Sequence, residues 1–235
     1  MSLKGGSTAM RRKTVAAALV LLALALALAG CATPQAVAAP PERSAFDAPA
    51  IYEKAAPATW TVLVNTVDGW WAKGSAFSVD SPGSVLTAYH VVKDYKEFKL
   101  VDWDGDTTYR ATVKRFDEKA DLALLEIANP SATPFLSLAA QSPKVGEEVM
   151  LVGSPSVHPE EPKGYIPAVA TVGRVGRAWA GRIVADITAS AGESGGALLD
   201  ANGRVVGLLL GILGPDPRIH TFASTSDLAA FLAGR

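Results

Sequence analysis

The sequence predicts an all-β fold, a barrel or a sandwich, that begins near Ala58 and continues to the C-terminus. Short segments rich in β-branched residues recur along this part of the chain, and Gly, Pro, Asp or Asn residues bound them. Asp104-Gly105 and Asn202-Gly203 each lie between two such segments, where this kind of dipeptide is typical of a hairpin turn. At 49% hydrophobic residues, the chain also has ample material for a core.

The expected strands fall into two groups of six. The first group comprises residues 60–67, 74–79, 84–87, 98–103, 109–116 and 122–127. The second comprises residues 148–152, 166–174, 182–187, 197–199, 205–213 and 219–223. Residues 226–232 begin with side chains that cap helices, so they predict a short C-terminal helix.

A serine flanked by glycines lies just before the apolar segment 205–210, in the string Gly192-Glu193-Ser194-Gly195-Gly196. Glycine at 192 lets the backbone bend so that neighbouring N–H groups point into one small cavity. The N–H groups of Gly192 and Ser194 would then stabilise a developing oxyanion. A serine hydroxyl is a weak nucleophile alone, so this interpretation needs a base and a group that orients the base.

Two further strings supply these groups: Val-Leu-Thr-Ala-Tyr-His-Val-Val, which contains His90, and Ala-Asp-Leu-Ala-Leu-Leu-Glu-Ile, which contains Asp121. Together with the Ser194 string they resemble the chymotrypsin-like (trypsin-like) serine peptidases, most closely the bacterial HtrA (Deg) branch. The order along the chain is the family's own: His, then Asp, then Ser. Each string is also next to an expected apolar strand.

The resemblance implies two six-stranded antiparallel β-barrels, one formed by about residues 58–140 and the other by about 141–235. It implies that Ser194 attacks a peptide carbonyl, that His90 takes and later returns the proton, and that Asp121 orients the imidazole. The oxyanion hole would be formed by Gly192 and Ser194. No PDZ domain follows in this sequence, so the cage-forming behaviour of the large HtrA members is not expected.

The resemblance also locates the primary specificity pocket, whose walls would come from Thr188 and Ala189 on one side and from Leu210, Gly211 and Ile212 on the other. None of these residues is charged, and Ile212 stands where a bulky side chain narrows the pocket. We therefore expect cleavage after small or medium apolar residues. His220, on a late strand, is either a substrate contact or an ordinary strand histidine.

Two features of the domain stay open. Glu193 replaces the Asn common in the HtrA branch, and a misplaced carboxylate there would spoil the oxyanion loop. Trp70 and Trp71 follow a turn; we expect one ring buried and the other covered, with an exposed patch for a partner or membrane as the alternative.

The N-terminus predicts a signal peptide. Residues 11–13 are basic, residues 14–30 are apolar, and the run ends in Leu-Ala-Gly-Cys at Cys31, which resembles the lipobox of bacterial lipoproteins. An ordinary secretory signal or a short membrane anchor with a coincidental cysteine is the alternative. A lipidated (palmitate-bearing) Cys31 would hold the chain on a membrane. Residues 32–57, rich in Ala and Pro, predict an extended tether. Either Met1 or Met10 is the start of translation.

These features predict a lipid-anchored protein of the bacterial cell envelope, and Ala32 favours the outer membrane facing the periplasm if the host is Gram-negative. A net charge of −1 argues against nucleic acid as a partner. A single cysteine excludes an internal disulfide. The sequence contains no metal-binding or phosphate-binding motif, so we expect no cofactor.

Two functions fit the sequence. The first is a membrane-anchored serine endopeptidase that acts on polypeptide substrates. The second is a catalytically inactive lipoprotein that binds peptides or envelope proteins in the same cleft. The sequence leaves the natural substrate, the regulation and the oligomeric state open.

Overall fold

The strands form two closed antiparallel barrels of six strands each in the computed structural model, which describes residues 45–67, 69–79, 83–127, 134–156, 164–179 and 181–234. The predicted signal peptide, the lipidation site Cys31 and the first part of the predicted tether lie outside the described residues. The two-barrel, all-β prediction is confirmed.

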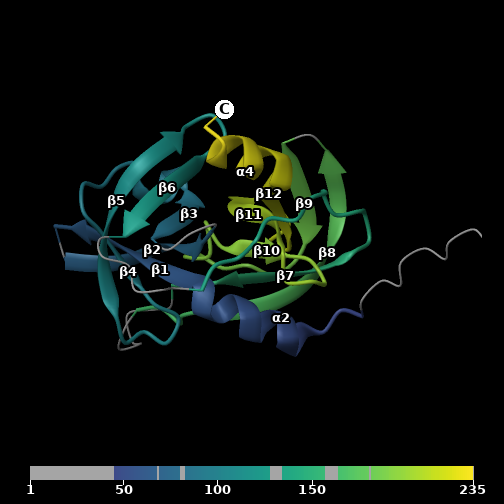
Figure 1. The fold of residues 1–235 in the computed structure, drawn as a ribbon, viewed down its shortest axis with the longest axis horizontal. Helices are drawn as coiled ribbons and strands as arrows, with labels where there is room; N and C mark the ends of the chain where they lie inside the picture. Colours follow the sequence, from purple (N-terminus) through teal and green to yellow (C-terminus); the bar gives the residue numbers. More distant parts are fainter. Residues whose placement is uncertain are drawn as a thin grey trace, which may run out of the picture. The chain divides into compact units, whose positions relative to one another are not determined.

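The first barrel has the strand order β1-β2-β3-β6-β5-β4 and is closed by pairing of β1 with β4. Its strands are β1 (Thr59–Thr66), β2 (Gly69–Ser78), β3 (Ser84–Ala88), β4 (Phe98–Val101), β5 (Thr108–Asp117) and β6 (Leu122–Ile127). It occupies the left half of Figure 1. Trp60 and Phe77 are fully buried in its interior. The Trp60 ring packs edge to face on the Tyr109 ring, with the ring centroids 5.5 Å apart.

The second barrel has the strand order β10-β11-β12-β9-β8-β7. Its strands are β7 (Glu148–Gly153), β8 (Val169–Trp179), β9 (Arg182–Asp186), β10 (Ala197–Leu199), β11 (Val205–Ile212) and β12 (Ile219–Ser224). A separate apolar cluster fills it, with Leu151, Ile183, Leu198 and Phe222 among its buried members. Because each barrel has its own core, each can hold one half of a site rigidly at the seam between them.

Every predicted strand is present, but several boundaries differ. Strand β8 continues to Trp179, because its second half pairs with β9. Strand β2 starts at Gly69, because Trp70 and Trp71 continue the hairpin with β1. Both rings stay partly exposed, at 38% and 54%, so the expectation of one buried and one covered ring is wrong.

A helix, α2 (Ala48–Ala55), lies within the range predicted as an extended tether. The Asp47 carboxylate caps it by accepting from the Ala50 N–H at 3.2 Å, and a 3₁₀ turn (Ala56–Ala58) leads from it into β1. Ile51 and Ala55 share one helix face and are buried. The folded part therefore begins before Ala58, and the tether prediction is wrong for this stretch.

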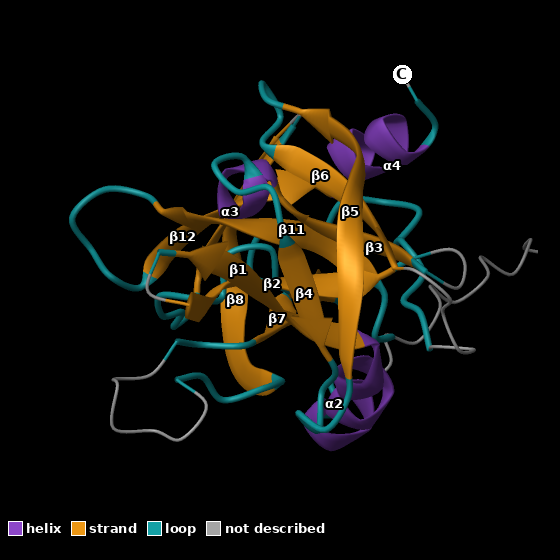
Figure 2. Cartoon of the chain, turned by 90° about the vertical axis from the view of Figure 1, so that its left-hand side faces the viewer, coloured by secondary structure: helices purple, strands orange, loops and turns teal. Residues whose placement is uncertain are grey.

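The predicted C-terminal helix is present as α4 (Thr225–Leu232), with Ser224 as its N-cap and Leu228 and Phe231 buried beneath it. Another short helix, α3 (Tyr89–Val92), follows β3 directly and carries His90. In Figure 2, α2 lies at the bottom of the folded body, and α3 and α4 lie in its upper half. Among the described residues, no helix combines the length and apolar character needed to cross a membrane.

Candidate active site

His90 and Asp121 are joined by two hydrogen bonds. The His90 backbone N–H donates to Asp121 Oδ1 at 2.8 Å, and His90 Nδ1 lies 2.7 Å from Asp121 Oδ2. A carboxylate only accepts, so Nδ1 carries the proton and Nε2 is left as the basic nitrogen of the neutral ring. The side chains are 36% and 28% exposed, so the pair lies at the surface of the seam, where a ligand can reach the ring.

Asp121 has an unusual backbone conformation, with φ of 59°. This left-handed region is uncommon for residues other than glycine, although Asp and Asn tolerate it best. The conformation also directs the Asp121 carbonyl oxygen to accept from the Tyr89 N–H at 3.1 Å. Three hydrogen bonds therefore tie the start of β6 to the first turn of α3, and they fix the carboxylate beneath the imidazole.

The loop before Ser194 is a tight turn. Gly192 has φ of 91°, and the Glu193 N–H donates to the Ser190 carbonyl across the turn at 3.2 Å. A glycine with positive φ at the third position is what a type II turn requires. A Cβ at residue 192 would overlap Ser156 N and lie 2.5 Å from Ser156 Oγ, so only glycine fits.

Two carbonyl groups of this loop accept backbone hydrogen bonds. The Ala191 carbonyl accepts from the Ser156 N–H at 2.8 Å, and the Glu193 carbonyl accepts from the Gly196 N–H at 2.9 Å. In a planar trans peptide the N–H points away from the preceding C=O, so the Gly192 N–H points away from the Ser156 N–H and the Ser194 N–H points away from the Gly196 N–H. Neither of these two N–H groups donates to any acceptor in the part of the chain that the structure describes. Among the described residues, the loop thus carries two backbone donors without a partner, at the residues that the sequence analysis assigns to an oxyanion hole.

Ser194 is held against the first barrel. Its carbonyl oxygen accepts from the Ser75 N–H on β2 at 2.8 Å. The next residue, Gly195, lies so close to β3 that a Cβ there would overlap the Ser75 carbonyl and come within 2.5 Å of Thr87 Oγ1 and 3.1 Å of the Ala88 nitrogen. Residues 190–196 of the second barrel, here called the serine turn, therefore pack against the end of the strand that leads into His90.

The Glu193 side chain folds back over its own turn. It is 2% exposed, and its Oε2 accepts from the Ser190 N–H at 2.6 Å. Among the described residues, Oε1 is buried without a hydrogen-bond partner. Burial raises the pKa of this carboxyl, and the Ser190 hydrogen bond opposes that shift. The Glu193 carboxylate therefore bonds within its own turn and not to the N–H groups of Gly192 and Ser194.

The two predicted walls of the specificity pocket meet at His220. His220 is buried, its Nδ1 lies 3.0 Å from the carbonyl oxygen of Ile187, and its Cα pairs with that of Ile212. Ile187 leads directly into Thr188 and Ala189, of which Thr188 is exposed and Ala189 half-buried. On β11, Leu210 and Gly211 are half-buried and Ile212 is 58% exposed. The hydrogen bond to Ile187 gives His220 a structural partner.

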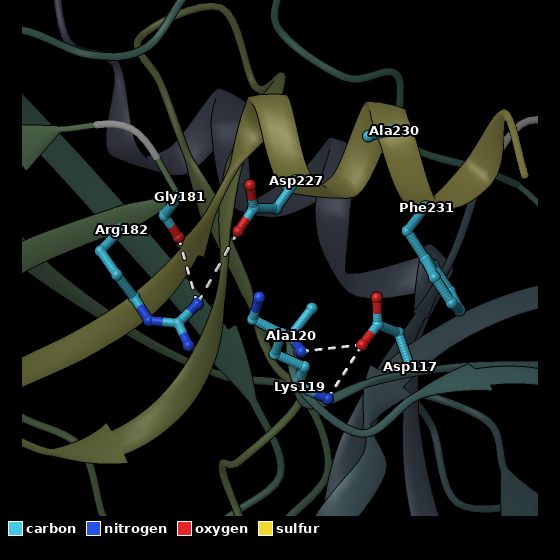
Figure 3. Close-up of a pocket in the computed structure, with 8 residues that line it drawn as sticks. All are labelled: Asp117, Lys119, Ala120, Gly181, Arg182, Asp227, Ala230 and Phe231. Atoms are coloured by element: carbon cyan, nitrogen blue, oxygen red, sulfur yellow. Dashed lines mark hydrogen bonds and ion pairs between the residues drawn. The ribbon is translucent and has the colours of Figure 1, made fainter. Parts of the chain in front are cut away.

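A hollow of about 450 Å³ lies beneath α4 and contains none of the predicted site residues (Figure 3). It is lined by Asp117, Lys119, Ala120, Gly181, Arg182, Asp227, Ala230 and Phe231. Asp117 Oδ1 accepts from the N–H groups of Lys119 and Ala120, both at 2.9 Å. These bonds stabilise the turn that precedes Asp121. No group of three or more His, Cys, Asp or Glu side chains suited to a metal ion occurs among the described residues.

Two antiparallel barrels, with a His–Asp pair on one and a glycine-flanked serine turn on the other, define the class of chymotrypsin-like serine peptidases. Comparison with known families gives the same result: the trypsin-like peptidase domain matches residues 74–208. The chain belongs to this family.

Curated relatives are of the HtrA type. Serine protease HTRA1B of Danio rerio is 36% identical over 145 residues, which cover 58% of this chain and 30% of the relative. Periplasmic serine endoprotease DegP of Salmonella typhimurium is 31% identical over 148 residues, covering 62% and 31%. Periplasmic pH-dependent serine endoprotease DegQ of Escherichia coli is 31% identical over 137 residues, covering 57% and 30%. The chain thus spans under a third of the length of these relatives.

Solved structures share the fold. A serine endoprotease from Yersinia pestis superposes with a TM-score of 0.68 at 21% identity, covering 78% of this chain and 64% of that one. The inactive form of the Rv3671c protease gives 0.65 at 24% identity, covering 79% and 92%. At these identities the likeness supports the two-barrel fold alone.

Proposed function

We propose that this chain is a serine endopeptidase in which Ser194, His90 and Asp121 form the catalytic triad. One observation carries the proposal: a carboxylate-bound imidazole lies at the same seam as a serine turn, and within the described part of the chain neither its Nε2 nor the N–H groups of Gly192 and Ser194 have a hydrogen-bond partner. Membership of the trypsin-like peptidase family and the names of the HtrA relatives support it.

The mechanism follows from these groups. Ser194 Oγ attacks the substrate carbonyl carbon while His90 Nε2 accepts the hydroxyl proton. Asp121 keeps the ring in the required tautomer and stabilises the imidazolium that forms. The N–H groups of Gly192 and Ser194 bind the oxyanion of the tetrahedral intermediate. His90 then delivers its proton to the leaving amine, and water, activated by the same imidazole, hydrolyses the acyl-enzyme.

The activity is tested with an unfolded protein such as casein as substrate. The wild-type chain is expected to cleave it, and Ser194→Ala is expected to show no turnover while melting at the wild-type temperature. If Ser194→Ala cleaves at the wild-type rate, the triad is wrong. If the folded wild-type chain cleaves no substrate but binds peptides, the chain is instead the catalytically inactive binding protein that the sequence allows.

We propose a preference for Val, Ala or Leu immediately before the cleaved bond. The segments assigned to the pocket walls, residues 188–189 and 210–212, carry no charge. His220, which pairs with Ile212, is hydrogen-bonded to the Ile187 backbone carbonyl. A charged Arg or Lys side chain would lose its hydration there without a compensating partner. Profiling with a peptide library tests this preference, and rapid cleavage after Arg or Lys with none after Val or Ala would contradict it.

We also propose that the chain is a lipoprotein of the bacterial envelope, anchored through Cys31 after removal of the signal peptide. The basic and apolar runs that end in Leu-Ala-Gly-Cys support this, and the relatives DegP and DegQ are named periplasmic. Growth with a clickable palmitate analogue tests it. The wild-type chain should take up label in the membrane fraction; if Cys31→Ser takes up equal label, the lipidation site is wrong.

A further inference from the structure

Ser75 on β2 uses all its polar groups, and its four hydrogen bonds reach three different segments. Its N–H donates to the Ser194 carbonyl at 2.8 Å, and its carbonyl accepts from Thr87 Oγ1 at 2.7 Å. Its Oγ donates to the Gly192 carbonyl at 2.8 Å and accepts from the Ser154 N–H at 2.7 Å. Ser75 itself is 0% exposed. One residue of the first barrel therefore connects the serine turn, the end of β7 and the strand that leads to His90.

The bond to the Gly192 carbonyl matters because of where that carbonyl lies. The peptide between Gly192 and Glu193 separates the two peptides that carry the free N–H groups. The flanking carbonyls of Ala191 and Glu193 are held by backbone donors of the second barrel, whereas the Gly192 carbonyl is held by a side chain of the first barrel. Glycine has a wide conformational range, so without this bond the central peptide can rotate. Because the central peptide shares a Cα with each flanking peptide, such a rotation would strain the hydrogen bonds of the Ala191 and Glu193 carbonyls and shift both donors.

The Ser75 hydroxyl has little freedom of its own. A Cβ at Gly153 would lie 3.2 Å from Ser75 Oγ, and a Cβ at Gly195 would overlap the Ser75 carbonyl. The hydroxyl is therefore enclosed by close-packed backbone and stays in the one orientation that serves Gly192 and Ser154. By contrast, the bond that closes the turn from within, from the Glu193 N–H to the Ser190 carbonyl, is long at 3.2 Å.

We propose that Ser75 is a positioning residue that holds the central peptide of the serine turn and thereby aims the N–H groups of Gly192 and Ser194 at the oxyanion. This inference rests on the proposed peptidase activity. It assigns to the first barrel a direct part in forming a hole whose donors all belong to the second. Ser75 does not contact the substrate; it acts through the Gly192 carbonyl.

The test compares Ser75→Ala with Ser78→Ala. Ser78 is a matched control because it lies on the same strand, is fully buried and accepts a hydrogen bond at 2.7 Å, but from Trp60 Nε1 in the barrel interior. Removing a whole oxyanion donor lowers kcat by about 10²–10³, so misaimed donors in Ser75→Ala should lower kcat by roughly 10- to 100-fold. KM should stay within about twofold, because the ground-state carbonyl gains little from the hole. Ser78→Ala should melt at a lower temperature with unchanged kcat.

A folded Ser75→Ala variant with wild-type kcat would overturn the proposal, and so would an equal loss of kcat in Ser78→Ala. If Ser75→Ala does not fold, Ser75→Cys carries the same prediction, because a thiol fills the site but bonds weakly. If the wild-type chain is inactive, the proposed function fails, and the positioning role is read by NMR in the Ser194→Ala background. Ser75→Ala should then shift and broaden the Gly192 and Glu193 amide signals, whereas Ser78→Ala should not; unchanged signals would overturn it.

Discussion

Replacing Gly192 with alanine should disable the serine turn while leaving both barrels folded. Gly192 has φ of 91°, and a Cβ there would overlap Ser156 N and approach the Ser154 carbonyl oxygen to 2.9 Å. Both contacts are with backbone atoms, which cannot rotate away as the end of a side chain can. The loop must therefore move, and the Gly192 N–H moves with it.

The expected magnitudes separate activity from stability. A left-handed conformation at a residue with a Cβ costs about 1–2 kcal/mol, and each kcal/mol lowers Tm by about 2–4 °C in a domain of this size. Loss of one oxyanion donor lowers kcat by about 10²–10³, equivalent to about 2.7–4 kcal/mol in the transition state. Gly192→Ala should thus fold, with a Tm a few degrees below that of the wild type. Its kcat should fall far more than this loss of stability explains.

The assay measures kcat on a peptide substrate and Tm by circular dichroism, with Gly146→Ala as the matched control. Gly146 has φ of 85° and no atom within 4 Å of the position of a Cβ, so it bears the backbone cost without a clash and lies away from the site. Its variant should lose stability but keep kcat. If a folded Gly192→Ala variant keeps kcat within about twofold of wild type, the assignment of the oxyanion loop is refuted.

Three further predictions follow from the same structure. Asp121→Asn should fold, because Asn tolerates the φ of 59°, but it should lower kcat by roughly 10⁴-fold, because the amide holds the wrong His90 tautomer; steady-state kinetics measure the loss, and a drop below tenfold would contradict the proposed role. Burial raises the pKa of Glu193 from its ordinary value of 4.5, so the folded chain binds this proton more tightly and the free energy of unfolding falls as pH rises above 4.5 through the raised pKa. Glu193→Gln removes this dependence. In urea unfolding, the free energy of unfolding of Glu193→Gln minus that of the wild type should therefore grow as pH rises over that interval. A difference that shrinks as pH rises would exclude the buried carboxyl as the cause. Ile51→Ala should destabilise the fold by about 2–5 kcal/mol, because the side chain is 4% exposed on α2; the exposed neighbour Glu53 provides the control, and thermal melts in which Ile51→Ala and Glu53→Ala match would show that α2 contributes nothing.

Most of the fold could be predicted from the sequence because the barrels have strong local patterns. The segments 122–127 and 197–199 were predicted with the boundaries that β6 and β10 have in the structure. Helix α2 was missed because its composition, rich in Ala and Pro, is also that of an extended tether. What makes it a helix is the burial of Ile51 and Ala55 against the folded body, which a local pattern does not contain.

The predicted site divides in the same way. His90, Asp121 and Ser194 could be proposed because each lies in a characteristic string next to a strand, and the structure joins the first two directly. Ser75 could not be singled out, since it reads only as one residue of a predicted strand. Its bond to Gly192 spans 117 positions in the sequence. The position of the Glu193 carboxylate could not be predicted either, because it depends on how the turn brings the Ser190 N–H to Oε2.

Labelling with a fluorophosphonate probe, followed by mass spectrometry of the modified peptide, tests the proposed triad most directly. Phosphonylation needs an activated hydroxyl and donors for the phosphonyl oxygen at the same place. The folded wild-type chain should carry the probe on Ser194 alone, and both Ser194→Ala and His90→Ala should stay unlabelled. Label on another residue, or a folded wild-type chain that takes up none, would contradict the triad.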